Sequence, residues 1–292
     1  MRCQFIEAEK ANHKINTLCR VMRVPRSTFY AWRKQTPSKR QVEDAKLKPL
    51  IREIHLESRE SYGAPRVHRK LRHAGISIGR HRVARLMREE RLQAKQRRKF
   101  KATTDSNHGH ATAPNLLARE FRPLAVDTVW VGDITYIWTR EGWLYLAVLL
   151  DLYSRRVVGW AMGPLITKQL ALDALRMAVS LRHPPVGLIH HTDRGSQYAS
   201  KAYQDALKAI GASCSMSRKG NCWDNAPSES FFATLKKDAV HGVTFATRDE
   251  ARREIVSYLC WYNAHRLHST IGYLAPKTYE ELAAQEQSAE AA

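Results

Sequence analysis

The sequence predicts an α/β protein in which a mixed sheet flanked by helices follows a small, basic, all-α region. Apolar residues recur at helical spacing through the first third of the chain, whereas from residue 129 they form short runs rich in Val, Ile, Leu and aromatic residues, a pattern typical of strands. The predicted order after residue 129 is β-β-β-α-β-α-β-α, which suits a mixed sheet covered by helices. Charge also divides the chain: residues 1–100 carry 27 Lys and Arg against 9 Asp and Glu, and residues 101–292 carry 21 against 19.

The composition indicates an intracellular protein that binds a polyanion. The net charge of +20 is most often found in proteins that bind nucleic acid. Five scattered cysteines without a C-x-x-C pair argue against a zinc finger and against a secreted disulfide framework. The N-terminus lacks an apolar signal region, and the longest apolar run, 144–150, is far shorter than the ~20 residues that span a bilayer. We therefore expect a soluble protein with no membrane partner.

Residues 12–35 predict two short helices around a turn. Ile15 and Leu18 lie at helical spacing, Pro25 interrupts the run, and Ser27 is a candidate cap for a second helix. This arrangement fits a helix-turn-helix and an ordinary helical hairpin equally well.

Three further helices are predicted before residue 95, starting near residues 46, 65 and 80 with turns between them. The last one carries arginines away from its apolar stripe, and such a helix is suited to contact DNA phosphates or groove edges. A solvated basic face is the alternative, but repetition of the pattern in so basic a segment favours DNA contact. We predict a helix-turn-helix-like DNA-binding region over 1–94 and a basic, polar linker over 95–120. The arginines are Arg80, Arg82, Arg85 and Arg88.

The remaining residues, 121–282, predict a single catalytic-core domain, followed by a frayed Ala- and Glu-rich tail over 283–292. Within the domain a three-stranded antiparallel meander comes first. The predicted elements are strands 129–138, 143–152 and 156–162, a helix 168–181, a strand 187–191, a helix 201–210, a strand 212–216, a helix that holds Glu229, and a last helix from about 248 to 263.

Three acidic residues stand where a site is expected. Asp133 lies inside the first strand, where an unpaired carboxylate is costly. Asp193 directly follows a short strand, at the end where open sheets present their sites. Glu229 lies in the first turn of its helix. Singly, Asp193 suits a turn and Glu229 suits a helix N-terminus, and Asp151 at the end of the second strand is a rival ligand.

Carboxylates brought together repel one another unless a cation intervenes. Mg²⁺ takes oxygen ligands and keeps positions for water and phosphate, and a pair of such ions can serve an in-line displacement at phosphorus. We therefore expect Asp133, Asp193 and Glu229 to be the catalytic and metal-binding residues. Because a stretch containing Gly and Asn, 217–224, precedes the last of them, we expect Asp133 and Asp193 to lie close together and Glu229 to stand apart until DNA or metal binds.

The spacing and the neighbouring residues make a resemblance specific. Fifty-nine residues lie between Asp133 and Asp193, and 35 between Asp193 and Glu229. His-Thr-Asp-Arg-Gly-Ser-Gln-Tyr at 191–198, Lys-Gly-Asn-Cys-Trp-Asp-Asn-Ala at 219–226 and Tyr-Asn-x-His-Arg-x-His-Ser at 262–269 complete the pattern. Together they resemble the OrfB-type transposases of the insertion-sequence-three family, within the DDE transposase and retroviral-type integrase superfamily, over nearly the whole chain.

The resemblance implies an RNase H-like core that binds two Mg²⁺ or Mn²⁺ ions, nicks element ends and joins the freed 3′-hydroxyl to another phosphodiester. It also implies DNA contact by Lys236, seven residues after Glu229, whose alternative is a generic surface lysine. Trp223 and Asn225 are expected to shape the loop before the catalytic helix. His265 and Arg266 are candidates for phosphate binding, with solvated helix-end residues as the alternative.

We thus expect a DNA transposase acting on element ends and target DNA as a dimer or larger assembly in the bacterial cytoplasm, near the nucleoid. The chain begins at Met1 without sustained heptads, whereas family members usually carry an upstream helix-turn-helix and leucine zipper, so an upstream-frame partner is also expected. The alternatives are a non-catalytic DNA-binding regulator or assembly subunit and an RNase H-like hydrolytic nuclease.

Overall fold

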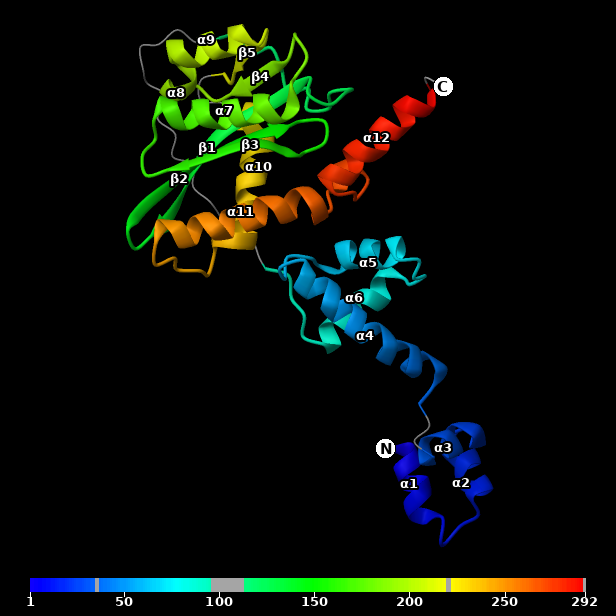
Figure 1. Ribbon diagram of the computed structural model, residues 1–292. Coiled ribbons are helices and arrows are strands. Elements are labelled where there is room, and N and C mark those ends of the chain that lie inside the picture. Colours follow the sequence, from blue (N-terminus) through cyan, green and yellow to red (C-terminus); the bar gives the residue numbers. More distant parts are fainter. Residues whose placement is uncertain (35–36, 96–112, 219–221, 291–292) are drawn as a thin grey trace.

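The computed structural model describes residues 1–34, 37–95, 113–218 and 222–290, and it contains two helical units and one sheet domain (Figure 1). The predicted linker therefore lies mostly outside the described residues, as do 219–221 of the predicted stretch before Glu229. The helices of the first unit are α1 (Arg2–Glu9), α2 (Ile15–Val21) and α3 (Arg26–Arg33). Those of the second unit are α4 (Lys39–Glu57), α5 (Ala64–His73) and α6 (Arg80–Glu89).

The first unit has a small core of its own, formed by Ile6, Leu18, Cys19 and Phe29. Its α2 and α3 are the two helices predicted within 12–35, and Pro25 stands at the N-cap of α3. The sequence patterns did not predict α1, because only Ile6 among its residues is buried and an amphipathic stripe is hardly developed.

The second unit begins earlier than predicted. Ser38 and Gln41 form a capping box. The backbone N–H of Gln41 donates to the Ser38 hydroxyl oxygen at 3.3 Å, and the backbone N–H of Ser38 donates to the Gln41 side-chain oxygen at 2.7 Å. These reciprocal bonds satisfy two amides at the helix start, so α4 begins at Lys39 rather than near residue 46. Its Ile51 packs with apolar residues of α5 and α6 and with Leu267 from the sheet domain.

A five-stranded mixed sheet forms the centre of the third unit, with the strand order β3-β2-β1-β4-β5. The predicted meander is confirmed, since β1 pairs antiparallel with β2 and β2 with β3. On the other side of β1, β4 and then β5 run parallel to it. The strands are β1 (Val129–Thr139), β2 (Gly142–Asp151), β3 (Val157–Gly163), β4 (Ile189–Thr192) and β5 (Ser213–Met216).

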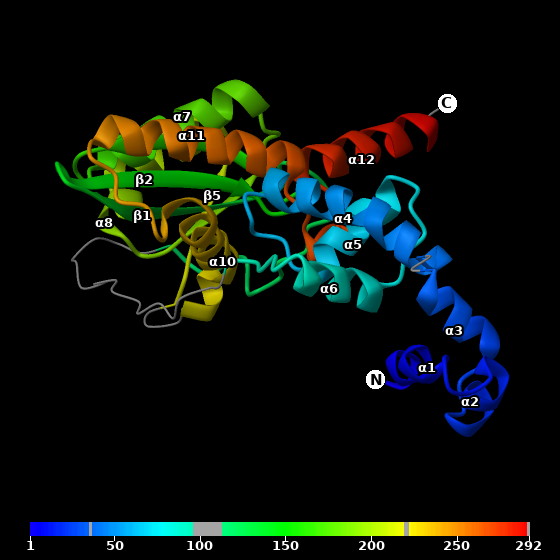
Figure 2. The same ribbon diagram turned by 90° about the horizontal axis from the view of Figure 1, so that it is seen from below.

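Helices cover both faces of this sheet (Figures 1 and 2). One face packs with α7 and α9 around a core that includes Trp130 and Leu149. The other face packs with α10 and α11 around a core that includes Val131 and Val148. The helices of this domain are α7 (Lys168–Arg182), α8 (Ser196–Ala199), α9 (Lys201–Ala209), α10 (Ala226–Leu235), α11 (Arg248–His265) and α12 (Pro276–Glu290), with short turns at Cys222–Asn225, Lys236–Val240 and Ser269–Ile271.

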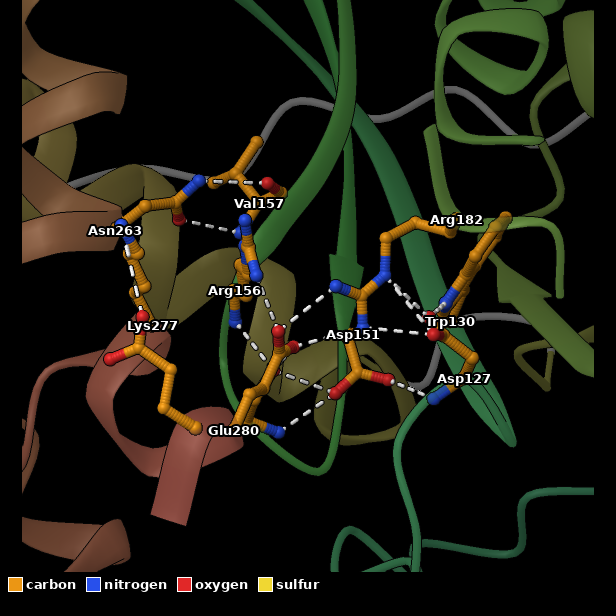
Figure 3. A network of polar contacts seen from close by, with 11 residues as sticks. Asp127, Trp130, Asp151, Arg156, Val157, Arg182, Asn263, Lys277 and Glu280 are labelled. Atoms are coloured by element: carbon orange, nitrogen blue, oxygen red, sulfur yellow. Dashed lines mark hydrogen bonds and ion pairs between the residues drawn. The ribbon is translucent and has the colours of Figure 1, made fainter. Parts of the chain in front are cut away.

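The C-terminal helix α12 differs from the frayed tail predicted over 283–292, because it remains helical through Glu290. Figure 3 shows the polar network that holds its first turns. Glu280 accepts from both terminal nitrogens of Arg182, at 2.9 and 3.0 Å, from the Ser154 hydroxyl at 2.7 Å and from Arg156 at 2.5 Å. A sequence pattern alone does not show this anchor, because its partners lie about 100 residues upstream. No helix in the described part of the chain is long and apolar enough to cross a membrane.

Candidate active site

Strand β1 directs Asp133 toward the face of the sheet that α10 covers. Side chains alternate along a strand: Val131 belongs to the core on the α10 side and Trp130 to the opposite core. Asp133 shares the direction of Val131. Its Oδ1 accepts from the Ile134 amide at 2.7 Å, and its Oδ2 accepts from the Asn225 side-chain amide at 3.0 Å. An ionised carboxylate has about four acceptor positions, so further positions stay available.

Gly132 precedes Asp133 because the ring of His190 on β4 packs against this position. A Cβ at residue 132 would lie 2.8 Å from Cε1 of His190. His190 is fully buried, and its Nε2 lies 2.8 Å from the hydroxyl oxygen of Tyr203. Burial, and then the charge of His191, lower the pKa of His190 to about 3. The neutral ring is thus part of the rigid wall behind Asp133.

The parallel pairing of β1 with β4 brings Asp193 beside Asp133. In this register Gly132 lies opposite Thr192, so Asp193, the first residue after β4, lies beside Asp133 within β1, with the two strands about 4.8 Å apart. The Oδ1 of Asp193 accepts from the Gly195 amide at 2.9 Å, which also makes Asp193 the turn residue that its sequence context suggested. The turn fixes the carboxylate at the end of the sheet.

Helix α10 brings Glu229 to the same end of the sheet. Its first turn contains Pro227 and Glu229, and its Phe231 and Phe232 anchor it in the core on the Asp133 side. Glu229 itself is exposed. Burial raises the pKa of Asp133 well above its usual range, and the negative charges of Asp193 and Glu229 raise it further. The three carboxylates therefore lie near enough to influence one another.

These carboxylates have the chemistry of a divalent-cation site but are not drawn together around one point. No group of three or more His, Cys, Asp or Glu side chains within 1–34, 37–95, 113–218 and 222–290 is spaced to hold a metal ion. Asp133 and Asp193 follow residues that pair between the adjacent strands β1 and β4, whereas the separate position of Glu229 stays a prediction. The donor set fits a hard divalent ion, since it consists of oxygens and since like charges raise the pKa of its central carboxyl group.

The loop before α10 is fixed by Asp224, which the sequence patterns did not single out. Its buried carboxylate accepts from the backbone amide and guanidinium of Arg218, from the Arg119 guanidinium and from the Asn115 amide. Hydrogen bonds from Arg218 are the main cause that lowers the pKa of Asp224 far below its usual range. Trp223, predicted to shape this loop, is 70% exposed, whereas Asn225 reaches Asp133.

Comparison with known proteins decides the family. Models of the integrase core domain match residues 123–222 and 210–276, and a model of an HTH-like domain matches residues 41–100. An uncharacterized 31 kDa protein of insertion element IS600 from Shigella sonnei is 48% identical over 90% of this chain and 97% of its own length. The transposase InsF for insertion sequence IS3A from Escherichia coli is 43% identical over 96% of this chain and 98% of its own length. The chain belongs to the IS3 family of transposases.

The predicted RNase H-like integrase fold, the transposase function and the polynucleotidyl-transferase activity are thereby confirmed. The HTH-like match covers α4 to α6 rather than residues 12–35, so the DNA-binding unit of this IS3-family transposase includes the arginine-bearing helix. Among solved structures, the HTLV-2 integrase catalytic core domain in complex with magnesium is similar at 17% identity with a TM-score of 0.41, over 55% of this chain and 99% of that chain. So distant a likeness adds nothing about the site.

Lys236 is buried near Asp133 rather than lying on an outer surface. It begins the π-helical turn Lys236–Val240 that continues α10, and only 7% of it is exposed. Its Nζ lies 4.5 Å from the centre of the Tyr136 ring on β1. Burial lowers its pKa, whereas the charge of Asp133 raises it. DNA contact by Lys236 stays a prediction, and its ammonium group lies near the charge of Asp133.

The arginines of α6 differ from the prediction of one outward basic face. Arg82 and Arg85 turn toward α4 and bind both oxygens of Asp44, at 2.7 and 2.5 Å. Two guanidinium groups on one carboxylate join the two helices, which the helical period could not show because Asp44 lies about 40 residues upstream. Arg80 and Arg88 are exposed, so the prediction of DNA contact stays open for them.

Two further candidates, Arg266 and Asp151, are buried and hydrogen-bonded within the protein. Arg266 is 3% exposed and donates to Asp238 at 2.8 Å, so it is not a solvated helix-end residue, whereas the side chain of His265 is exposed. The rival ligand Asp151 is fully buried, and its oxygens accept from the Asp127 amide and from the amide and hydroxyl of Ser154. Asp151 also points to the opposite face of the sheet from Asp133, because it lies three residues along β2 from Val148, which pairs with Asp133.

Proposed function

We propose that Asp133, Asp193 and Glu229 hold two divalent ions, Mg²⁺ or Mn²⁺, with which this transposase nicks element ends and joins the freed 3′-hydroxyl to another phosphodiester. The observation that carries the proposal is the raised pKa of Asp133, caused by burial and by the charges of Asp193 and Glu229. Burial and neighbouring negative charge favour the neutral form of such a carboxyl group, and a bound cation favours the ionised form. When bound, the metal supplies activation of the attacking oxygen and stabilisation of the leaving one.

The remaining groups of the chain position these ligands. Asn225 and the Ile134 amide fix the orientation of the Asp133 carboxylate, and the Gly195 amide does the same for Asp193. The ammonium group of Lys236 adds positive charge beside Asp133. With these groups held in place, we expect Glu229 of α10 to complete the site when DNA or metal binds.

The proposal includes assembly on DNA as a dimer or larger, with a possible upstream-frame partner, in the cytoplasm near the nucleoid. Joining two element ends to a target requires more than one active site near one DNA complex. The basic first third of the chain, with 27 Lys and Arg against 9 Asp and Glu, suits contact with phosphates along these DNA segments.

The test uses the full chain and a duplex that carries a labelled element end, with Mg²⁺, with Mn²⁺ or with a chelator. We expect nicks followed by joined products in either metal and neither product with the chelator. Nicks that never proceed to joined products, even with a supplied 3′-hydroxyl, would indicate a hydrolytic nuclease. Tight DNA binding with no cleavage under any condition would indicate a regulator or assembly subunit.

A further inference from the structure

A pocket of about 300 Å³ lies on the other side of α10 from Glu229. Pro227, Ser230 and Thr234 of α10 line it, and their spacing of three and four residues puts them on one side of the helix, away from Glu229. The end of β2 and the segment after α11 form its other walls, and Arg66 reaches it from α5. The pocket therefore lies where the α4–α6 unit meets the sheet domain.

Three arginines line the pocket: Arg66, Arg155 and Arg266. They come from α5, from the turn between β2 and β3, and from the segment after α11. His268 lies among them, and burial together with the charges of all three arginines lowers its pKa well below the usual value. The positive charge is therefore concentrated within a small, partly enclosed volume.

The carboxylates nearby do not balance this charge. Asp238 binds Arg266, and Asp151 lines the pocket but uses its oxygens for Asp127 and Ser154. Among the described residues, neither Arg66 nor Arg155 forms an ion pair with a carboxylate. Arg266 is buried and Arg66 and Arg155 are half-buried, and guanidinium groups removed from water around one pocket are costly unless an anion compensates them.

The same arginines have hydrogen-bond donors to spare. The Nε atoms of Arg155 and Arg266 and the Nε2 of His268 are buried without a hydrogen-bond partner within the described part of the chain. Arg266 is 3% exposed, so water does not readily replace a missing acceptor. Arg66 donates to the Leu267 carbonyl at 3.1 Å and Arg155 to the Phe121 carbonyl at 3.0 Å, which holds both side chains in place and leaves their other nitrogens available.

We propose that this pocket binds one phosphate group through Arg66, Arg155 and Arg266. Guanidinium groups match the geometry of phosphate oxygens, and Ser230 and Thr234 supply hydroxyl groups at the same wall. The phosphate comes either from a DNA backbone or from free inorganic phosphate, and both present the same oxygens. A bound phosphate would link the α4–α6 unit to the sheet domain and would brace α10 from behind. The site is independent of the metal chemistry proposed for Asp133.

The first arm of the test uses the full chain and inorganic phosphate. Thermal unfolding is followed at increasing phosphate with ionic strength held constant by chloride, and ³¹P line broadening reports binding directly. We expect a saturating rise in melting temperature for the wild type and loss of that rise in Arg155→Gln and in Arg66→Gln. The matched controls are Arg69→Gln, one turn from Arg66 and exposed, and Arg156→Gln, whose side chain binds Glu280 instead.

The second arm measures duplex DNA binding against salt concentration. If a backbone phosphate occupies the pocket, Arg155→Gln and Arg66→Gln reduce the slope of log affinity against log salt by about one phosphate contact relative to the controls. If only free phosphate binds, the slopes stay equal while the thermal response is lost. Because the two variants lie in different units, misfolding of one leaves the other as a test. An equal phosphate response and an equal salt slope in wild type, variants and controls would overturn the proposal.

Discussion

Replacing Asp133 by Asn should stabilise the metal-free transposase while it removes a proposed metal ligand. When a chelator keeps the protein free of metal, the Asp133 carboxylate is buried and is repelled by Asp193 and Glu229. Burial and this repulsion raise its pKa. An amide of the same shape removes the charge. Asn225 can hydrogen-bond to the new amide. In the wild type its Nδ2 donates to Asp133, and its Oδ1 has no partner among the described residues. If the Asn225 side-chain amide flips, its Oδ1 accepts from the NH₂ group of the variant residue.

We expect Asp133→Asn to raise the free energy of unfolding by about 1–3 kcal/mol with a chelator present, the size typical for relief of an uncompensated buried polar group. The sign follows from linkage: a carboxyl group whose folded pKa is raised destabilises the fold above that pKa and not below its unfolded pKa. The advantage of the variant should therefore be present at neutral pH, and it should disappear as the pH falls to the ordinary pKa of an aspartate in the unfolded chain.

Urea unfolding with a chelator and with Mg²⁺ separates charge relief from other effects. Saturating Mg²⁺ stabilises a protein that binds it only when folded, by about 2.7 kcal/mol at 100 times the dissociation constant. We expect this gain in the wild type and its loss in Asp133→Asn, so Mg²⁺ should reverse the order of stability. Asp173→Asn, at an exposed position on α7, is the matched control. A variant less stable than the wild type in chelator at neutral pH would refute the reasoning.

Two other changes test the structure around the site. Glu280→Gln should lower the free energy of unfolding by about 2 kcal/mol at neutral pH, because it removes charged hydrogen bonds. Burial raises the pKa of Glu280, but hydrogen bonds from Arg182, Ser154 and Arg156 outweigh burial, so the pKa is lowered on balance. A lowered folded pKa gives stability that is fully present above the unfolded pKa and is lost as pH falls through the folded pKa, so the difference between variant and wild type in urea unfolding should be smaller at pH 3 than at pH 7. Gly132→Ala should cost about 1–3 kcal/mol and reduce strand transfer, because its Cβ would collide with His190. Unchanged strand transfer in this variant would show that the His190 ring can move aside without displacing the Asp133 carboxylate.

The sequence predicted most of the sheet domain because its signals are local. The meander, the short strands and the helices appear as apolar runs or helical stripes, and Asp133, Asp193 and Glu229 were recognisable from their spacing. The start of α4 was also encoded locally, in the Ser38–Gln41 pair, but a Pro-containing polar stretch obscured it.

The features that the sequence did not reveal depend on contacts between distant segments. The inward turn of Arg82 and Arg85 depends on Asp44, and the order of α12 depends on Arg182 and Glu280. Helical spacing shows which side of a helix is polar but not which polar residue will find a partner on another helix. For the same reason Asp224, whose partners include a residue 109 positions upstream, was passed over beside the more conspicuous Trp223.

The most direct test of the central claim is strand transfer by the three amide variants, Asp133→Asn, Asp193→Asn and Glu229→Gln, in full-length protein with Mg²⁺ and a labelled element end. DNA binding is measured on the same preparations, so that loss of chemistry is separated from loss of substrate. We predict that each variant binds the element end as the wild type does and yields no joined product, while Asp173→Asn retains full activity. Full strand transfer by any one of the three variants would contradict the assignment of that carboxylate to the site.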